Sequence, residues 1–454
     1  MADTPLASTR RDFLAVLGLA SVGLQAAGTD AAAAQLGAGQ QAAPPPTAAQ
    51  PALAPAQKLP SAAANGKFGP ADPPRMLQPS SADMGSLFAQ LTDVALANRG
   101  SLLAGSPPKP FDEALRETVR ARVREILSWQ PPKVDLAPEV LERVDCGDYF
   151  RERVVYSTTP WFRVPAYVLV PKKMKGPAPA IVDLHSHGGM FLFGKEKVID
   201  LGDNHPVMTD YHQKNYDGRP TATELVKRGF VVISADTFMF GERRLIMDED
   251  LRHGWDRSRY TTDVVQQLNQ KCRAKESTLA KSLALAGATW PGIVAWDDRR
   301  AVDYLCTRNE VDPARIGCIG ISMGGYRSTY LAALDTRIAA ACIVGFMSST
   351  GPMLQAHIDT HSWVHFLPGL HRVLDLPELA ALTAPRGLFV QQCSQDRLFP
   401  LTGMQAAVDR VHELYRAGGD ANRLITRFYD APHKWTIEMQ DEAFAWLAKQ
   451  LNHA

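Results

Sequence analysis

Cysteine is scarce in this sequence, and none of its six residues stands in a C-x-x-C spacing. Zinc ribbons and thioredoxin-type motifs are therefore not expected, and cysteines in apolar runs are expected to be small core residues. A disulfide between Cys146 and Cys272 is conceivable, but their spacing does not require one. An excess of charge of one sign is also missing, because 49 Lys and Arg face 48 Asp and Glu. No global field attracts nucleic acid or an anionic membrane, so partners have to be recognised by local sites.

The first 34 residues have the pattern of an export signal. Paired arginines, Arg10-Arg11, precede an apolar run over 15–24 and alanine-rich sites, where we expect cleavage near Ala34, with Ala27 as the alternative. The arginine pair resembles that of twin-arginine signals. The apolar run is too short to span a bilayer, and the other interpretation is a basic start with a short helix on the membrane surface. We expect a periplasmic or extracellular protein with no stable membrane anchor after signal removal.

Composition divides the rest of the chain into three parts. Residues 35–80 are rich in Ala, Pro, Gln and Gly, which cannot fill a core and predicts a linker. Residues 81–144 contain apolar residues at helical spacing, which predicts a helical N-terminal extension. From 145 to 454 short apolar strands alternate with helices, and we expect this part to be the main domain, which carries the chemistry considered below.

The alternation predicts an α/β architecture with a mostly parallel, twisted sheet of about eight strands flanked by helices. The first two strands lack an intervening helix and are expected to pair antiparallel at the edge. Expected strands cover 153–157, 164–170, 180–184, 230–235, 316–321, 341–346, 388–392 and 424–428. Expected helices cover 221–228, 293–308, 324–334, 401–417 and 437–451.

Two excursions, about 238–291 and 348–374, are too long for simple connections. We expect them to be insertions that cover a pocket, and whether either forms a mobile lid stays open.

Residues 320–325 read Gly-Ile-Ser-Met-Gly-Gly, which fits the spacing G-x-S-x-G between a predicted strand and a predicted helix. A tight strand-to-helix turn of this kind lifts the serine above the sheet. The helix N-terminus behind it directs amide donors at negative charge. The pattern predicts Ser322 as a nucleophile, and the alternative is a glycine-rich turn with a capping serine.

A serine hydroxyl needs a base, and the base needs an orienting acid. His433 lies between the last predicted strand and the last helix, and Asp396 lies in the loop after the strand 388–392. The order Ser322, Asp396, His433 is that of the α/β hydrolases, not that of chymotrypsin or subtilisin. The alternatives are an exposed loop histidine and a turn-forming aspartate.

A tetrahedral intermediate also needs donors for its oxyanion. We expect the amide of Met323 to be one donor and the amide of Gly188 or Gly189 to be the other. The two glycines belong to the sequence His-Ser-His-Gly-Gly at 185–189, directly after the third predicted strand.

Several aromatic and histidine residues near these loops are candidates for the substrate pocket: His187, Met190, Phe191, His361 and Trp363. His361 also lies in a series with His357 and His365 at i, i+4 and i+8, which would share one helix face and could bind metal. No cysteine or acidic cluster accompanies the series, so we expect neither a metal nor an organic cofactor.

Six segments carry a resemblance to a known family. They are 185–191 (HSHGGMF), 193–197 (FGKEK), 296–301 (WDDRRA), the turn 320–325, 394–396 (SQD) and His433. Residues 150–451 thereby resemble the dienelactone hydrolase and acetyl-xylan-esterase-like branch of the α/β hydrolases, and the helical extension and leader resemble those of its exported bacterial esterases. Dienelactone hydrolases proper use a cysteine nucleophile where this chain has Ser322, so the resemblance implies ordinary ester cleavage.

The sequence therefore predicts a serine hydrolase that cleaves a small-molecule or carbohydrate ester through an acyl-enzyme intermediate. Two alternatives stay open: an amidase, peptidase or lactone hydrolase with the same triad, and a non-catalytic binding protein on this fold. The acyl and alcohol parts of the substrate and the oligomeric state also stay open.

Overall fold

A computed structural model describes residues 82–454 except 101, 104–110, 255, 419 and 453–454. The predicted signal peptide and linker lie outside the described residues, so both stay predictions. Among the described helices, none is both long and apolar enough to cross a membrane. All six cysteines are free, so a disulfide between Cys146 and Cys272 is not formed.

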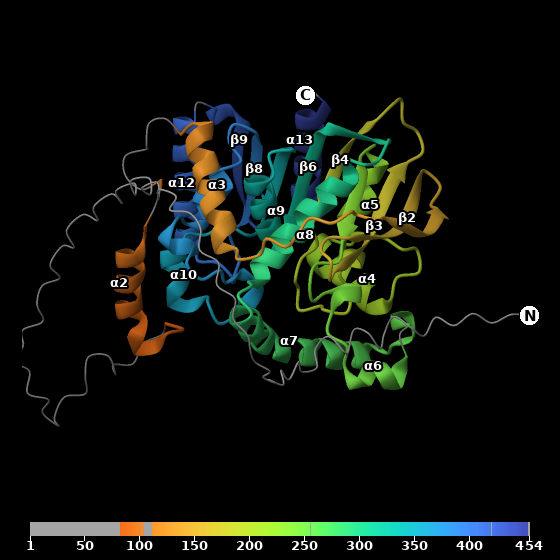
Figure 1. Ribbon diagram of the computed structural model, residues 1–454, viewed down its shortest axis with the longest axis horizontal. Helices are drawn as coiled ribbons and strands as arrows, with labels where there is room; N and C mark the ends of the chain where they lie inside the picture. Colours follow the sequence, from red (N-terminus) through yellow and green to blue (C-terminus); the bar gives the residue numbers. More distant parts are fainter. Residues whose placement is uncertain (1–81, 101, 104–110, 255, 419, 453–454) are drawn as a thin grey trace, which may run out of the picture. The chain divides into compact units, whose positions relative to one another are not determined.

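Nine strands form one sheet in the order β1-β2-β3-β5-β4-β6-β7-β8-β9 (Figure 1). The pairs from β5 to β9 are parallel, and the pairs β1–β2, β2–β3 and β3–β5 are antiparallel. The predicted architecture, a mostly parallel sheet flanked by helices, is confirmed. The strands are β1 (Glu139–Asp145), β2 (Tyr149–Ser157), β3 (Arg163–Pro171), β4 (Ala178–Asp183), β5 (Val231–Ala235), β6 (Val311–Ile321), β7 (Ile338–Val344), β8 (Gly387–Cys393) and β9 (Leu424–Tyr429).

The strand that the sequence did not predict is β1. All its residues are exposed except Val144, which is half-buried, so it has no apolar face to produce an alternating pattern. The antiparallel pairing of β2 with β3 was predicted correctly. The outer edge of the sheet, however, is β1, which pairs with β2.

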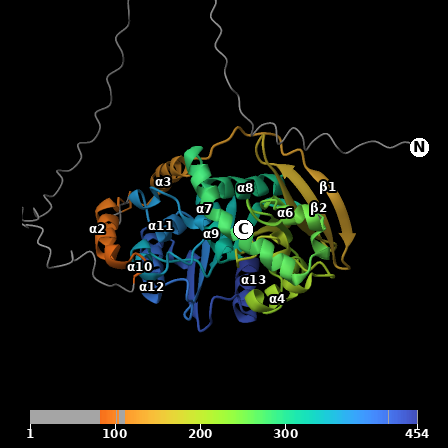
Figure 2. The same cartoon turned by 90° about the horizontal axis from the view of Figure 1, so that it is seen from below.

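Helices cover both faces of the sheet (Figure 2). In β4, Val182 belongs to the core that includes α8 and α9, whereas Ile181 belongs to the core that includes α5 and α13. Because both faces of the central strands are buried, these strands are continuous apolar runs. The helices are α2 (Phe88–Asn98), α3 (Glu113–Ile126), α4 (Pro206–Tyr216), α5 (Thr221–Lys227), α6 (Asp248–His253), α7 (Thr262–Leu285), α8 (Trp290–Leu305), α9 (Met323–Leu334), α10 (Thr350–Ala356), α11 (Leu376–Ala381), α12 (Leu401–Ala417) and α13 (Ile437–Asn452).

The first excursion, 238–291, contains the long helix α7, which the sequence did not predict. Only a few of its apolar residues face the core, among them Val265, Leu268 and Cys272. The other positions are mostly polar, so the apolar stripe is too narrow to mark a helix clearly. The second excursion, 348–374, contains α10. Both excursions contribute side chains to the cavity described below.

Helix α3 packs against α9, and Arg120 joins it to two helix ends. The Arg120 side chain is almost completely buried. It donates hydrogen bonds to the carbonyl oxygens of Ala333, 2.9 Å away, and Leu382, 3.0 Å away. These carbonyls lie at the C-terminal ends of α9 and α11, where carbonyl groups lack partners within the helix. Arg120 therefore supplies a charged donor to each carbonyl, and the Leu382 carbonyl also accepts a longer hydrogen bond from Arg386, 3.3 Å away.

Replacing Arg120 by Met is expected to lower the free energy of unfolding by about 3 kcal/mol, because two buried carbonyls lose a charged donor. The matched control is Arg122→Met on the same helix, whose side chain is 57% exposed and whose loss should cost less than about 0.5 kcal/mol. Urea unfolding followed by circular dichroism measures both values. Equal losses in the two variants would contradict the role of Arg120.

Candidate active site

Ser322 lies in the turn between β6 and α9, with φ +59° and ψ −124°. This φ lies in the left-handed region that a residue with a side chain rarely adopts, and such strain persists only where the surroundings impose it. The neighbouring glycines show what imposes it here. A Cβ atom on Gly320 would lie 2.4 Å from the carbonyl oxygen of Leu184, and one on Gly324 would lie 1.9 Å from it. The turn can approach the end of β4 only because both positions lack a side chain.

His433 and Asp396 are joined by a hydrogen bond of 2.6 Å between Nδ1 and Oδ2. The Asp396 carboxylate is fully buried and its Oδ1 accepts a hydrogen bond from the amide of Leu398, 2.8 Å away. A carboxylate at Nδ1 holds the proton on that nitrogen and leaves the lone pair on Nε2. Among the described residues, Nε2 of His433 has no hydrogen-bond partner.

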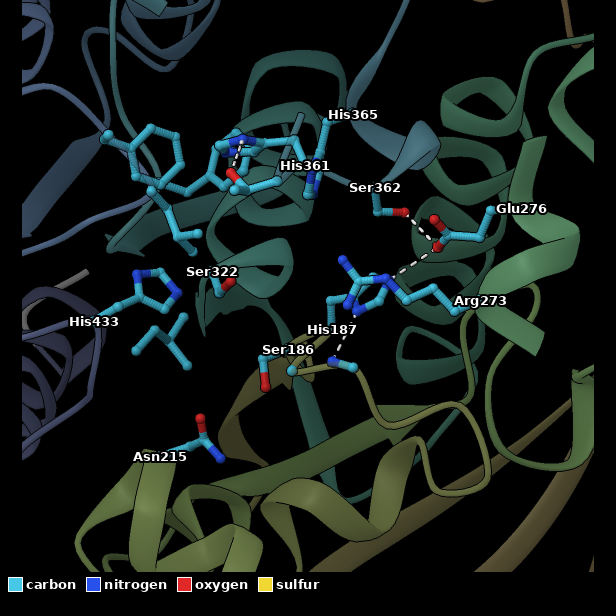
Figure 3. A pocket seen from close by; sticks show the side chains of 17 residues that line it. Ser186, His187, Asn215, Arg273, Glu276, Ser322, His361, Ser362, His365 and His433 are labelled. Atoms are coloured by element: carbon cyan, nitrogen blue, oxygen red, sulfur yellow. Dashed lines mark hydrogen bonds and ion pairs between the residues drawn. The ribbon is translucent and has the colours of Figure 1, made fainter. Parts of the chain in front are cut away.

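The cavity that contains these groups has a volume of about 190 Å³. Ser322 and His433 both line it and lie on the same side of it (Figure 3). No hydrogen bond joins Ser322 to His433 in the part of the chain that is described, and such bonds often tighten only when substrate binds. The structure therefore brings three predicted residues together from the carboxyl ends of β6, β8 and β9.

The loop after β4 supplies the other wall of this end of the cavity. Gly188 has φ +53°, and a Cβ atom there would lie 2.1 Å from the hydroxyl oxygen of Tyr211. The amide of Gly189 already donates to Nδ1 of His187, 3.0 Å away. Within the described chain, the amide of Gly188 has no such acceptor. The geometry therefore favours Gly188 over Gly189 as a donor for an anion in the cavity.

The buried side chain of Lys197 orients this loop. Its Nζ donates to the carbonyl oxygens of Ser186, 2.8 Å away, and His187, 2.9 Å away. The carbonyl and the N–H of one peptide group point in opposite directions, so a carbonyl of His187 held by Lys197 turns the amide of Gly188 the other way. The amide of Met323, the first residue of α9, has no acceptor within its helix. Gly188 and Met323 are thus the two predicted donors whose amides are available.

Lys197 is fully buried and lies 4.6 Å from the centroid of the Phe240 ring. Burial lowers the pKa of its ammonium group well below the usual range, and attraction to Asp236 and Glu196 offsets this effect only in part. Lys197 was not predicted to be functional, although it belongs to the segment FGKEK.

The wall opposite His433 is polar and comes from the two excursions. Glu276 on α7 accepts hydrogen bonds on Oε1 from Ser362, 2.6 Å away. Its Oε1 also lies 3.0 Å from Nε2 of His187. Arg273, one turn earlier on α7, extends toward the cavity (Figure 3). Ser362 lies in the segment 361–363 that was expected to line the pocket. Arg273 and Glu276 were not predicted, because a mostly polar helix carries no local signal that it will lie above a distant serine.

The predicted pocket residues divide into two groups. His187 and His361 line the cavity. Met190 and Phe191 instead point into the core, where Phe191 stacks on Phe240 with 5.0 Å between ring centroids. Trp363 is 43% exposed and does not line the cavity. A local pattern of aromatic residues does not show whether a side chain such as Phe191 will point into the cavity or into the core.

The single helix on which His357, His361 and His365 would share one face is not formed, since α10 ends at Ala356. His361 and His365 nevertheless lie close together, with ring centroids 5.7 Å apart. Among the described residues, no group of three or more His, Cys, Asp or Glu side chains is arranged to hold a metal ion.

A model of the Abhydrolase family matches residues 106–416, more than half of the chain. The chain belongs to this family. Among curated proteins, the Bacillus subtilis protein named "Putative hydrolase YtaP" is 26% identical over 340 residues, which are 74% of this chain and 100% of that protein. The chain is therefore a member of a hydrolase family.

Solved structures show the same fold for this member of the Abhydrolase family. A "putative acetyl xylan esterase" from Bacteroides fragilis matches with a TM-score of 0.57 and 19% identity, over 76% of this chain and 82% of the other. A glucuronoyl esterase from Teredinibacter turnerae matches with a TM-score of 0.52 and 16% identity, over 78% and 90%. A glucuronoyl esterase from Solibacter usitatus matches with a TM-score of 0.51 and 17% identity, over 77% of this chain and 97% of the other. The predicted α/β-hydrolase fold is thus confirmed.

The histidines around the cavity should make stability depend on pH. Burial lowers the pKa of His365 and of His185 well below the usual range. Both rings stay neutral in the folded protein, but each takes up a proton near pH 6.5 when the chain unfolds. Their contribution to stability is therefore complete above pH 6.5 and is lost as the pH falls toward the folded-state pKa.

Replacing His365 by Phe should reduce the slope of the free energy of unfolding against pH, below pH 6.5, by up to about 1.4 kcal/mol per pH unit. Its ring nitrogens have no partner among the described residues, and its ring lies 4.7 Å from that of Phe346, so a phenyl ring suits the position. The matched control is His253→Phe at an exposed position. Urea unfolding at several pH values between 5 and 7.5 measures the slope, and identical slopes for wild type and His365→Phe would contradict the prediction.

Proposed function

We propose that the protein is a serine hydrolase that cleaves carboxylic esters, with Ser322 as nucleophile, His433 as general base and Asp396 as the orienting acid. The observation that carries the proposal is the hydrogen bond between Asp396 and Nδ1 of His433. Nε2 of His433 has no partner among the described residues. His433 lines the same cavity as Ser322, which lies on a strained turn.

The reaction follows from these positions. Nε2 of His433 accepts the proton of the Ser322 hydroxyl while Oγ attacks the ester carbonyl carbon. The carbonyl electron pair moves to oxygen, and the amides of Met323 and Gly188 stabilise the resulting anion. When the carbonyl re-forms, the bond to the alcohol oxygen breaks and the alcohol takes the proton from His433. Water then attacks the acyl carbon, His433 accepts its proton, and the acid leaves as Ser322 is restored.

Two observations support an ester with a short acyl group as substrate. One solved structure with this fold is named as a putative acetyl xylan esterase, and an acetyl group is a short acyl group. The cavity of about 190 Å³ is smaller than typical drug-sized pockets. Small-molecule and carbohydrate esters with short acyl chains therefore suit the site.

The full chain is expected to hydrolyse 4-nitrophenyl acetate faster than the butyrate, and the butyrate faster than the octanoate. Replacing Ser322 by Ala should lower kcat by a factor of about 10⁴ or more, since the nucleophile is lost. The control is Ser282→Ala, at an exposed position on α7, which should keep full activity. Equal rates in the folded wild-type and Ser322→Ala proteins would refute the proposal and favour a binding protein.

Lys197→Met should lower kcat for 4-nitrophenyl acetate about tenfold to a hundredfold, with KM changed less than about threefold. The reason is that the His187 carbonyl then keeps only its hydrogen bond from the amide of Met190 among the described residues. The amide of Gly188 is therefore held less firmly, and oxyanion donors act mainly in the transition state. The control is Lys214→Met, an exposed lysine on the nearby α4. A rise in KM with an unchanged kcat would show that Lys197 affects substrate binding instead.

A further inference from the structure

The cavity above Ser322 is lined by one arginine and one glutamate, Arg273 and Glu276, among the described residues. Both project from the same face of α7, because residues three apart in a helix are neighbours. The Glu276 carboxylate already has partners in the protein. Its Oε1 accepts a hydrogen bond from Ser362 and lies 3.0 Å from Nε2 of His187.

Arg273 is different. In the part of the chain that is described, no carboxylate lies within ion-pair distance of its guanidinium group, although Glu276 is one turn away. Arg273 is exposed as well as lining the cavity, so it stands where the cavity meets solvent. Figure 3 shows its guanidinium group between α7 and the side of the cavity that holds Ser322.

We infer that Arg273 binds a carboxylate on the substrate, so that the preferred substrates are esters that carry a free carboxylate away from the bond that is cleaved. This inference rests on the proposed function and names its substrate class. A guanidinium group matches a carboxylate in a planar, two-pronged arrangement. A position at the cavity entrance suits a charged group, because the carboxylate stays partly hydrated while the ester reaches Ser322.

The histidine rings near Arg273 favour their neutral forms. Burial lowers the pKa of His187 below its usual range, and the adjacent Arg273 acts in the same direction. Burial has the same effect on the pKa of His361. Arg273 is the arginine among the described residues that line the cavity, and its guanidinium group stays charged whatever the protonation of the histidines.

Two matched substrate pairs test the inference on the full chain. The first pair places the charge on the acyl side. It consists of the mono-4-nitrophenyl ester of adipic acid and the 4-nitrophenyl ester of adipamic acid, in which a neutral amide replaces the carboxylate. The second places it on the alcohol side: 4-acetoxybenzoate and 4-acetoxybenzamide. We expect wild type to prefer the carboxylate member of at least one pair.

Arg273→Gln should lower kcat/KM for the preferred carboxylate ester by about tenfold to a hundredfold, mainly through KM. The neutral member of that pair should change less than about threefold. Arg273→Lys should recover part of the preference, because it restores the charge but not the two-pronged geometry. The control is Lys275→Gln, which removes an exposed positive charge from the same helix at a position that does not line the cavity.

The outcomes separate this inference from the proposed function. If the neutral esters are hydrolysed in a Ser322-dependent way but wild type prefers the carboxylate member of neither pair, the assignment of Arg273 is overturned. The proposed function then still stands. Equal losses for charged and neutral esters in Arg273→Gln, or equal effects of Lys275→Gln, also overturn it. If no ester shows Ser322-dependent turnover, the proposed function fails and this inference fails with it.

Discussion

The close approach of the Ser322 turn to the end of β4 is the constraint on which the site depends. Gly320 and Gly324 both face the carbonyl oxygen of Leu184, and neither could carry even a methyl group without moving the turn away. The loop with Gly188 begins directly after Leu184. The same contact therefore sets the distance between the serine and the donors of that loop, and it imposes the strained backbone of Ser322.

Buried charges hold the loop from its other side. Nζ of Lys195 lies 2.7 Å from Oδ2 of Asp236 and 2.7 Å from Oε1 of Glu242. Gly194 and Gly241 lie so close to Asp236 that a Cβ atom on either would be 2.2 Å from its Oδ1. Buried ion pairs add little net stability, but each charge loses much if its partner is displaced. We interpret the network as a device that permits one arrangement of the segment, which then presents Lys197 to the loop carbonyls.

In the proposed function, one part of the chain provides the groups for bond cleavage and another part provides the cavity walls that would contact the substrate. Ser322, Asp396 and His433 follow strands of the sheet, whose positions are set by packing on both faces. Arg273, Glu276 and Ser362 come from the two excursions, which contact the sheet less extensively. Changes in these walls would alter the substrate while leaving the reacting groups in place, which is how one fold accommodates many activities.

Local signals were sufficient for the parallel sheet, for the turn at Ser322, and for His433 and Asp396 as candidates. Continuous apolar runs mark doubly buried strands, and glycine spacing and strand ends are features of neighbouring residues. The strand β1 and the helix α7 gave no such signal, because most of their residues face solvent or polar groups. Packing alone determined that Met190 and Phe191 turn into the core, and that Arg273 lines the same cavity as Ser322. Each of these depends on contacts between segments far apart in the chain, and such contacts leave no periodic trace in either segment.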